Sequence, residues 1–260
     1  MDVMPASDAT QRFSSRVENY VRYRPSYPHA IVELLTKECG LRRDSIVADI
    51  AFGTGIFTKL LLENGNKVFG VEPNADMRKA GELFLVDYPR FTSVAGTAED
   101  TTLDDHSVDI VTAAQAAHWF DLKKARQEFI RITKPGGWSV LLWNERSIHS
   151  TPFLRAYEEV LLNFGTDYNE VRHERTTETI HEFFAPTPFH SRVFDNHQKI
   201  DYGGLEGRLL SSSYIPAAGH PNYQPMLTEL KRTFDAHQVN GKVTLEYKTR
   251  VYYSQLDRER

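Results

Sequence analysis

Two glycines and two acidic residues in the first third of the chain have the types and spacing of a nucleoside-binding site. Gly53 and Gly55 follow directly on an apolar run at 46–51, and Glu72 ends the next apolar run. Glycine permits the positive φ, or the close approach of a ligand, that a tight strand-to-helix turn requires. An acid at the end of the next strand can accept hydrogen bonds from both ribose hydroxyls. Asp49, just before the turn, is suited to holding the turn's amides or a nearby ammonium group.

The residues around this turn narrow the class of ligand. A dinucleotide fingerprint would place a third glycine, or an alanine, at the position of Thr58. No phosphate-binding loop of the type G-x-x-x-x-G-K-[ST] is present. An NAD(P)-dependent oxidoreductase is therefore an alternative function, and Thr58 argues against it because it does not match the fingerprint.

Strand-like and helix-like segments alternate around these residues. Short apolar runs at 46–51, 67–71, 91–95, 107–113 and 138–143 are separated by segments with helical spacing. This rhythm predicts a doubly wound, Rossmann-like α/β fold with a mostly parallel sheet of about seven strands. The last two strands are expected at 191–200 and 243–253. Strict alternation in the latter makes it the clearest strand, and at least one late strand should be antiparallel.

The domain organisation expected from this pattern is one domain over residues 1–260. Residues 10–143 would form the cofactor-binding core, and 144–188 a helical insertion over the carboxyl edge of the sheet. Residues 189–260 would complete the sheet. An amphipathic helix is also expected around residues 13–21, from the spacing of its apolar positions.

Composition bounds the function further. Hydrophobic residues make up 40% of the 260 residues, charged residues 25%, and the net charge is −4. This negative net charge argues against a protein whose main function is to bind the phosphate backbone of a nucleic acid. The single cysteine and the histidine spacing give no metal site. No apolar run is long enough for a membrane span and no secretory signal opens the sequence, so a cytoplasmic protein is expected.

Five motifs in order resemble the class I S-adenosylmethionine-dependent methyltransferases. They are VADIAFGTGIFTKLL, VFGVEPNADM, AGTAED, SVDIVTAAQAAHWF and ITKPGGW. The sequence is most similar to the small-molecule enzymes of the ubiquinone-biosynthesis and trans-aconitate type, over roughly residues 10–145. Ala51 stands where the first motif of the family usually has its first glycine. The resemblance implies S-adenosyl-L-methionine as cofactor, S-adenosyl-L-homocysteine as product, and a small-molecule methyl acceptor.

The resemblance also implies which residues contact the cofactor. The backbone at Gly53 and Gly55 would approach the methionine part, and Glu72 would bind the ribose. Glu99 would accept from the adenine amine. The remaining implied contacts are Tyr20, Arg24, Asp49, Ala51, Pro73, Asn74, Met77, Ala98 and Gln115.

The acceptor side is expected from the same comparison and from residue types. His118, just beyond Gln115, would face the methyl group and is the candidate catalytic residue, and Tyr27 and Trp119 would complete the pocket. The insertion carries residues typical of an apolar pocket with anion-holding groups, namely Phe153, Tyr157, Phe164, Tyr168, Phe183 and Phe184 with Arg155, Arg172 and Arg175. A satellite core built by the same aromatics is the alternative. An RNA methyltransferase on the same fold is a further alternative, opposed by the negative net charge.

Overall fold

A computed structural model describes residues 23–166, 168, 174–212 and 214–256. The expected helix around 13–21, with Tyr20, lies outside the described residues. The described chain contains a seven-stranded sheet in the order β3-β2-β1-β4-β5-β7-β6. The strands are β1 (Ile46–Ile50), β2 (Lys67–Val71), β3 (Phe91–Val94), β4 (Val108–Ala114), β5 (Thr133–Arg146), β6 (His190–Ile200) and β7 (Val243–Ser254).

The sheet is mostly parallel, as predicted. β1 pairs in parallel with β2 and β4, and β4 with β5. β7 runs antiparallel to both of its neighbours, β5 and β6. The alternation that predicts β7 is visible in its burial, since Val243, Leu245 and Tyr247 are buried and the residues between them are less so. The Rossmann-like fold with a late antiparallel strand is confirmed.

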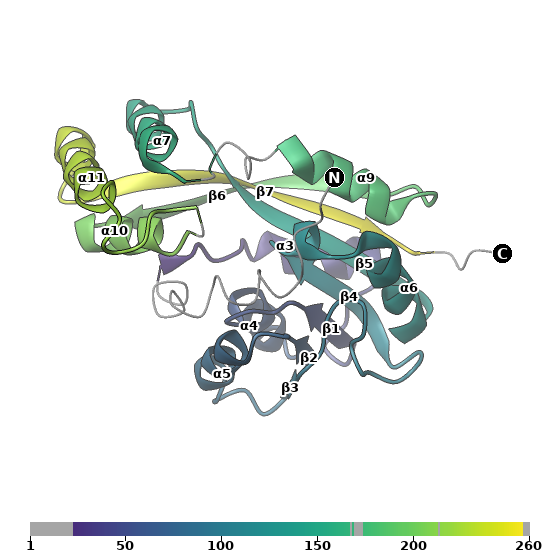
Figure 1. The fold of residues 1–260 in the computed structure, drawn as a ribbon. Coiled ribbons are helices and arrows are strands. Elements are labelled where there is room, and N and C mark those ends of the chain that lie inside the picture. Colours follow the sequence, from purple (N-terminus) through teal and green to yellow (C-terminus); the bar gives the residue numbers. More distant parts are fainter. Residues whose placement is uncertain (1–22, 167, 169–173, 213, 257–260) are drawn as a thin grey trace.

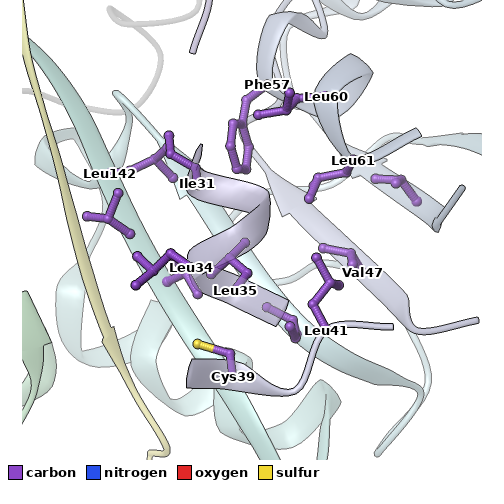
Figure 2. Packing of buried hydrophobic residues seen from close by; sticks show 14 of the residues in the cluster. Ile31, Leu34, Leu35, Cys39, Leu41, Val47, Phe57, Leu60, Leu61 and Leu142 are labelled. Atoms are coloured by element: carbon purple, nitrogen blue, oxygen red, sulfur yellow. The ribbon is translucent and has the colours of Figure 1, made fainter. Parts of the chain in front are cut away.

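Helices cover both faces of the sheet (Figure 1). Their bounds are α3 (Ala30–Cys39), α4 (Ile56–Glu63), α5 (Ala75–Phe84), α6 (Leu122–Ile132), α7 (Pro152–Phe164), α9 (Glu174–Phe184), α10 (Tyr202–Leu210) and α11 (Tyr223–His237). Because side chains alternate along a strand, Val140 and Leu142 pack with α3 and α4, whereas Leu141 packs with α6 and α9. Figure 2 shows the first of these clusters, with Ile31, Leu34 and Leu35 of α3 against the sheet.

Helices α7 and α9, which follow β5 in the chain, pack against different parts of the fold. α7 packs with α10 and α11 in a third cluster at one end of β6 and β7 (Figure 1). α9 packs on the sheet face beside α6, where Ile180, Phe183 and Phe184 are fully buried or nearly so. The aromatics predicted to line a pocket are thus largely core residues: Phe153 and Tyr157 are buried in the third cluster. Of the arginines in the segment, Arg155 is exposed.

Two elements differ from the sequence expectation. β5 begins at Thr133 rather than at 138, and its pairing with β4 shifts register where the Pro-Gly-Gly segment is inserted. α10 falls on the sequence YGGLEGRLL, whose glycines do not predict a helix. Its Asp201 cap accepts from the amide of Gly204 at 2.8 Å, and Leu205 and Leu209 are fully buried. Packing therefore outweighs propensity here. No helix in the described part of the chain is long and apolar enough to cross a membrane.

Candidate functional site

The glycine turn after β1 is left-handed at three positions. Ala51, Gly53 and Gly55 have φ values of 54°, 59° and 85°. A Cβ at Gly55 would lie 2.7 Å from a methyl carbon of Leu85, so this position requires glycine for space as well as for φ. The side chain of Leu85 therefore packs directly against the turn at Gly55. Ala51 adopts a conformation that costs an L-residue roughly 1–2 kcal/mol.

Glu72 ties the end of β2 to this turn. It is 7% exposed, and its two carboxylate oxygens accept from the backbone amides of Gly53 at 3.0 Å and Asn74 at 2.9 Å. Burial raises its pKa, and the two amides oppose that rise. A carboxylate has about four lone-pair positions, so each oxygen keeps capacity for a further donor such as a ribose hydroxyl.

Asp49 lies beneath the turn, 1% exposed. It accepts from the hydroxyls of Thr58 at 2.6 Å and Thr112 at 2.8 Å. The turn amide of Gly53 instead donates to Glu72. The predicted role of holding the turn's amides therefore belongs to Glu72, and Thr58 has a positive role that the sequence did not indicate. Burial raises the pKa of Asp49 to about 6, against the lowering effect of the two hydroxyls.

This raised pKa predicts a pH-dependent stability that Asp49→Asn removes. The folded state holds the proton more tightly than the unfolded state, so the contribution of Asp49 to stability falls as pH rises from about 4 to above 6. The loss is on the order of 2–3 kcal/mol. Asparagine keeps both threonine contacts, because a hydroxyl also accepts from an amide. Urea unfolding at pH 4, 5, 6 and 7 should show the variant gaining on the wild type as pH rises.

Asp104→Asn is the matched control, since Asp104 is exposed. Its difference from the wild type should not change in this way over the same pH range. A constant difference between Asp49→Asn and wild type would contradict the buried-acid account.

Next to Glu72, residues 73 and 74 lead into α5, which begins at Ala75. The side chain of Asn74 caps this helix by accepting from the amides of Asp76 and Met77, both at 2.9 Å. Met77 is buried, and its terminal methyl lies 3.4 Å from where a Cβ of Gly53 would be. Pro73 is exposed. Asn74 and Met77 are thus joined to the turn, while Pro73 lies at the surface beside it.

The expected adenine side lies beyond β3. Ala98 is buried in the cluster beneath α6 and α9. Glu99 is partly buried, and one of its carboxylate oxygens accepts from the amide of Asp121 at 2.9 Å. Glu99 therefore links the loop after β3 to the start of α6, with its second oxygen left for another donor.

A polar network at the end of β5 is the main feature that sequence reasoning missed. Gln115, at φ 60°, donates from its side-chain amide to the carbonyl of Asn144 at 3.1 Å. The Asn144 side chain accepts from Thr249 at 2.5 Å and donates to the carbonyl of Ser26 at 3.2 Å. Asn196 donates to the same carbonyl at 2.8 Å. These partners are up to 170 residues apart, so no local pattern marks them.

The remaining predicted residues lie in the segment before α3 and in the loop after β4. Tyr27 packs edge-on against Phe57, with ring centroids 5.1 Å apart. His118 is exposed, and its ring lies 4.8 Å from that of Trp119. Arg24 donates to the carbonyl of Ser211 at 3.0 Å. The N-terminal segment is thereby joined to the end of α10.

The site fits a cationic nucleoside ligand. Asp49 and Glu72 are two buried acids, and the charge of Asp49 raises the pKa of Glu72. Two acids in one place make a negative environment that favours a sulfonium or ammonium group. It disfavours a pyrophosphate for the same reason. The hydroxyl of Thr54 in the turn is buried and has no hydrogen-bond partner among the described residues. In the described part of the chain, no three His, Cys, Asp or Glu side chains are grouped to hold a metal ion.

Comparison with known proteins agrees with this geometry. The model of a methyltransferase domain family matches residues 48–141. An uncharacterized methyltransferase of Mycobacterium tuberculosis is 36% identical over 182 residues, which are 70% of this chain and 67% of that relative. A solved structure assigned to the type II methyltransferases, from Anaeromyxobacter dehalogenans, superimposes with a TM-score of 0.68 at 22% identity. The superposition covers 89% of this chain and 96% of the Anaeromyxobacter chain.

A second solved structure is that of phosphoethanolamine N-methyltransferase 2 from Haemonchus contortus, bound to phosphomonomethylethanolamine and S-adenosylhomocysteine. Its TM-score is 0.54 at 14% identity, over 99% of this chain and 61% of that one. Both structures share the fold. The Rossmann-like fold, the turn followed by an acid and the 36% identical methyltransferase together define the class of protein. The chain belongs to the class I S-adenosylmethionine-dependent methyltransferases.

Proposed function

We propose that the chain transfers a methyl group from S-adenosyl-L-methionine to a small-molecule acceptor. The observation that carries the cofactor assignment is the hydrogen bond from Gly53 to Glu72, which places a buried acceptor at the left-handed turn. Glu72 would bind the ribose hydroxyls, Glu99 the adenine amine, and Asp49 would supply negative potential beneath the sulfonium side. In this proposal residues 1–260 act as one domain, with 10–143 binding the cofactor and 189–260 completing the sheet. Of the segment 144–188, α7 lies on the acceptor side and α9 covers a face of the sheet.

Methyl transfer does not require the protein to form a covalent bond to the substrate. When bound, the cofactor supplies a methyl group that is already activated for displacement. The chain must then align the acceptor with that methyl group and exclude water, which together contribute roughly 7–11 kcal/mol in well-oriented systems. An acceptor that must lose a proton needs a base, for which we propose His118, four residues after the end of β4. A carboxylate acceptor needs none at pH 7.

A small acceptor is supported by what lies across the carboxyl edge. Arg24 joins the segment before α3 to the end of α10, and Ser26 is joined to β5 and β6 by Asn144 and Asn196. The net charge of −4 also favours a small acceptor over a nucleic acid.

Methyl-labelled S-adenosylmethionine tests the proposal directly. The protein is incubated with pools of carboxylic acids, quinols and amines, and separately with total transfer RNA. We expect label in a small-molecule pool and none in RNA. Label in RNA, or no binding of the cofactor, would contradict the proposal.

A further inference from the structure

Two buried arginines near the end of β5 have donors that nothing in the described chain uses. Arg146 is 9% exposed and Arg208 is 8% exposed. Arg146 donates from Nη2 to the Glu158 carboxylate and to the Tyr168 hydroxyl, the latter at 3.0 Å. Its Nη1, and the Nε of Arg208, are buried without a hydrogen-bond partner among the described residues. Leaving a donor of a buried charged group unmet is costly, so such donors indicate a partner that binds there.

The two guanidinium groups belong to one cluster. Both interact electrostatically with Tyr157 and Tyr214, and the Arg146 guanidinium lies 5.0 Å from the centre of the Tyr157 ring. Tyr247 is the cross-strand neighbour of Arg146 on β7 and a hydrogen-bond partner of Arg208. β5, β7, α7 and α10 thus bring these side chains to one place.

The described residues of the cluster carry an excess of positive charge. Burial raises the pKa of Tyr157 and of Tyr168, so both phenols are neutral at pH 7. Glu158 is the buried carboxylate that pairs with Arg146. Among the described residues of the cluster, two guanidinium groups face one carboxylate, and a ligand of charge −1 would balance the remaining positive charge.

The position of this charge matches the acceptor side of the site. Arg146 ends β5 two residues after Asn144, whose carbonyl accepts from Gln115 at the end of β4. Two residues of strand span about 7 Å. The cluster therefore adjoins the carboxyl edge, where ligands of open α/β sheets bind.

We infer that Arg146 and Arg208 form the subsite that binds a carboxylate of the methyl acceptor. The inference rests on the proposed function and names its substrate class. The planar guanidinium offers paired donors that suit the two oxygens of a carboxylate, and one carboxylate balances the charge of the cluster. A phosphate monoester, with nearly two charges, would overcompensate it.

Acetate tests the subsite because it is small enough to need no matching carbon skeleton. Thermal unfolding of the full chain is followed with sodium acetate, acetamide, methyl phosphate or sodium chloride at matched ionic strength. At about ten times its Kd, acetate should raise the midpoint by about 3–6 °C above sodium chloride. Acetamide should give no such shift, and methyl phosphate a smaller one.

The variants separate the subsite from general salt effects. Arg146→Gln and Arg208→Gln should each lose the acetate-specific shift, Arg146→Lys should retain part of it, and Arg155→Gln, at an exposed arginine of α7, should keep it. All of these variants should keep the shift caused by S-adenosylhomocysteine. No acetate-specific shift in wild type, an undiminished shift in both glutamine variants, or a larger shift with methyl phosphate would overturn the inference. If S-adenosylhomocysteine does not raise the unfolding midpoint of the wild-type protein, the proposed function is contradicted instead.

Discussion

Alanine at position 72 is expected to weaken the binding of S-adenosylhomocysteine by about 10-fold to 150-fold, or ~1.5–3 kcal/mol. The change removes the acceptor proposed for the ribose hydroxyls, which would then be buried without a partner. It also frees the amides of Gly53 and Asn74 that the carboxylate now holds at 3.0 and 2.9 Å. Calorimetric titration of wild type and Glu72→Ala measures the difference.

Two comparisons make this result specific. Glu159→Ala removes an exposed glutamate of α7 and should leave the affinity unchanged. Glu72→Gln keeps one carbonyl oxygen and should fall between wild type and alanine. If folded Glu72→Ala binds as tightly as wild type, the ribose assignment is wrong.

Phe183→Ala is expected to lower the free energy of unfolding by about 3–5 kcal/mol. Phe183 is fully buried between α9 and the sheet, with its ring 5.2 Å from that of Phe129 and 5.2 Å from that of Phe184. The cost combines the lost transfer of the ring from water with the cavity left in a dense core. Urea unfolding monitored by circular dichroism gives the value.

The control is Phe84→Ala on α5, where the side chain is 37% exposed. It should cost well under half as much, because water already reaches the ring. Equal losses in the two variants would show that α9 does not form part of the core.

The fold could be predicted from local patterns because those patterns have short periods. Alternation from Val243 to Tyr253 marks β7, and apolar runs of four to seven residues mark the buried parallel strands. The cofactor turn could be recognised for a similar reason. Gly53, Gly55 and Glu72 lie within twenty residues, on one strand–helix–strand unit.

The acceptor side could not be predicted because it depends on pairs distant in sequence. Arg146 is opposite Tyr247 only through the register of β5 and β7, and Arg208 lies on a glycine-rich helix that propensity does not predict. The residue types of the aromatics in 144–188 are equally typical of a pocket lining and of a hydrophobic core. Burial distinguishes the two, and it places Phe183 and Phe184 in the core.

The central claim is that the turn and its two buried acids bind S-adenosylmethionine rather than a dinucleotide. Calorimetric titration of the wild-type protein with S-adenosylhomocysteine and with NADH tests it most directly. The carboxylate of Glu72 at the glycine turn predicts binding of one S-adenosylhomocysteine per chain. Thr58, where a dinucleotide fingerprint needs glycine or alanine, predicts no measurable heat with NADH. Saturable binding of NADH, with none of S-adenosylhomocysteine, would contradict the account.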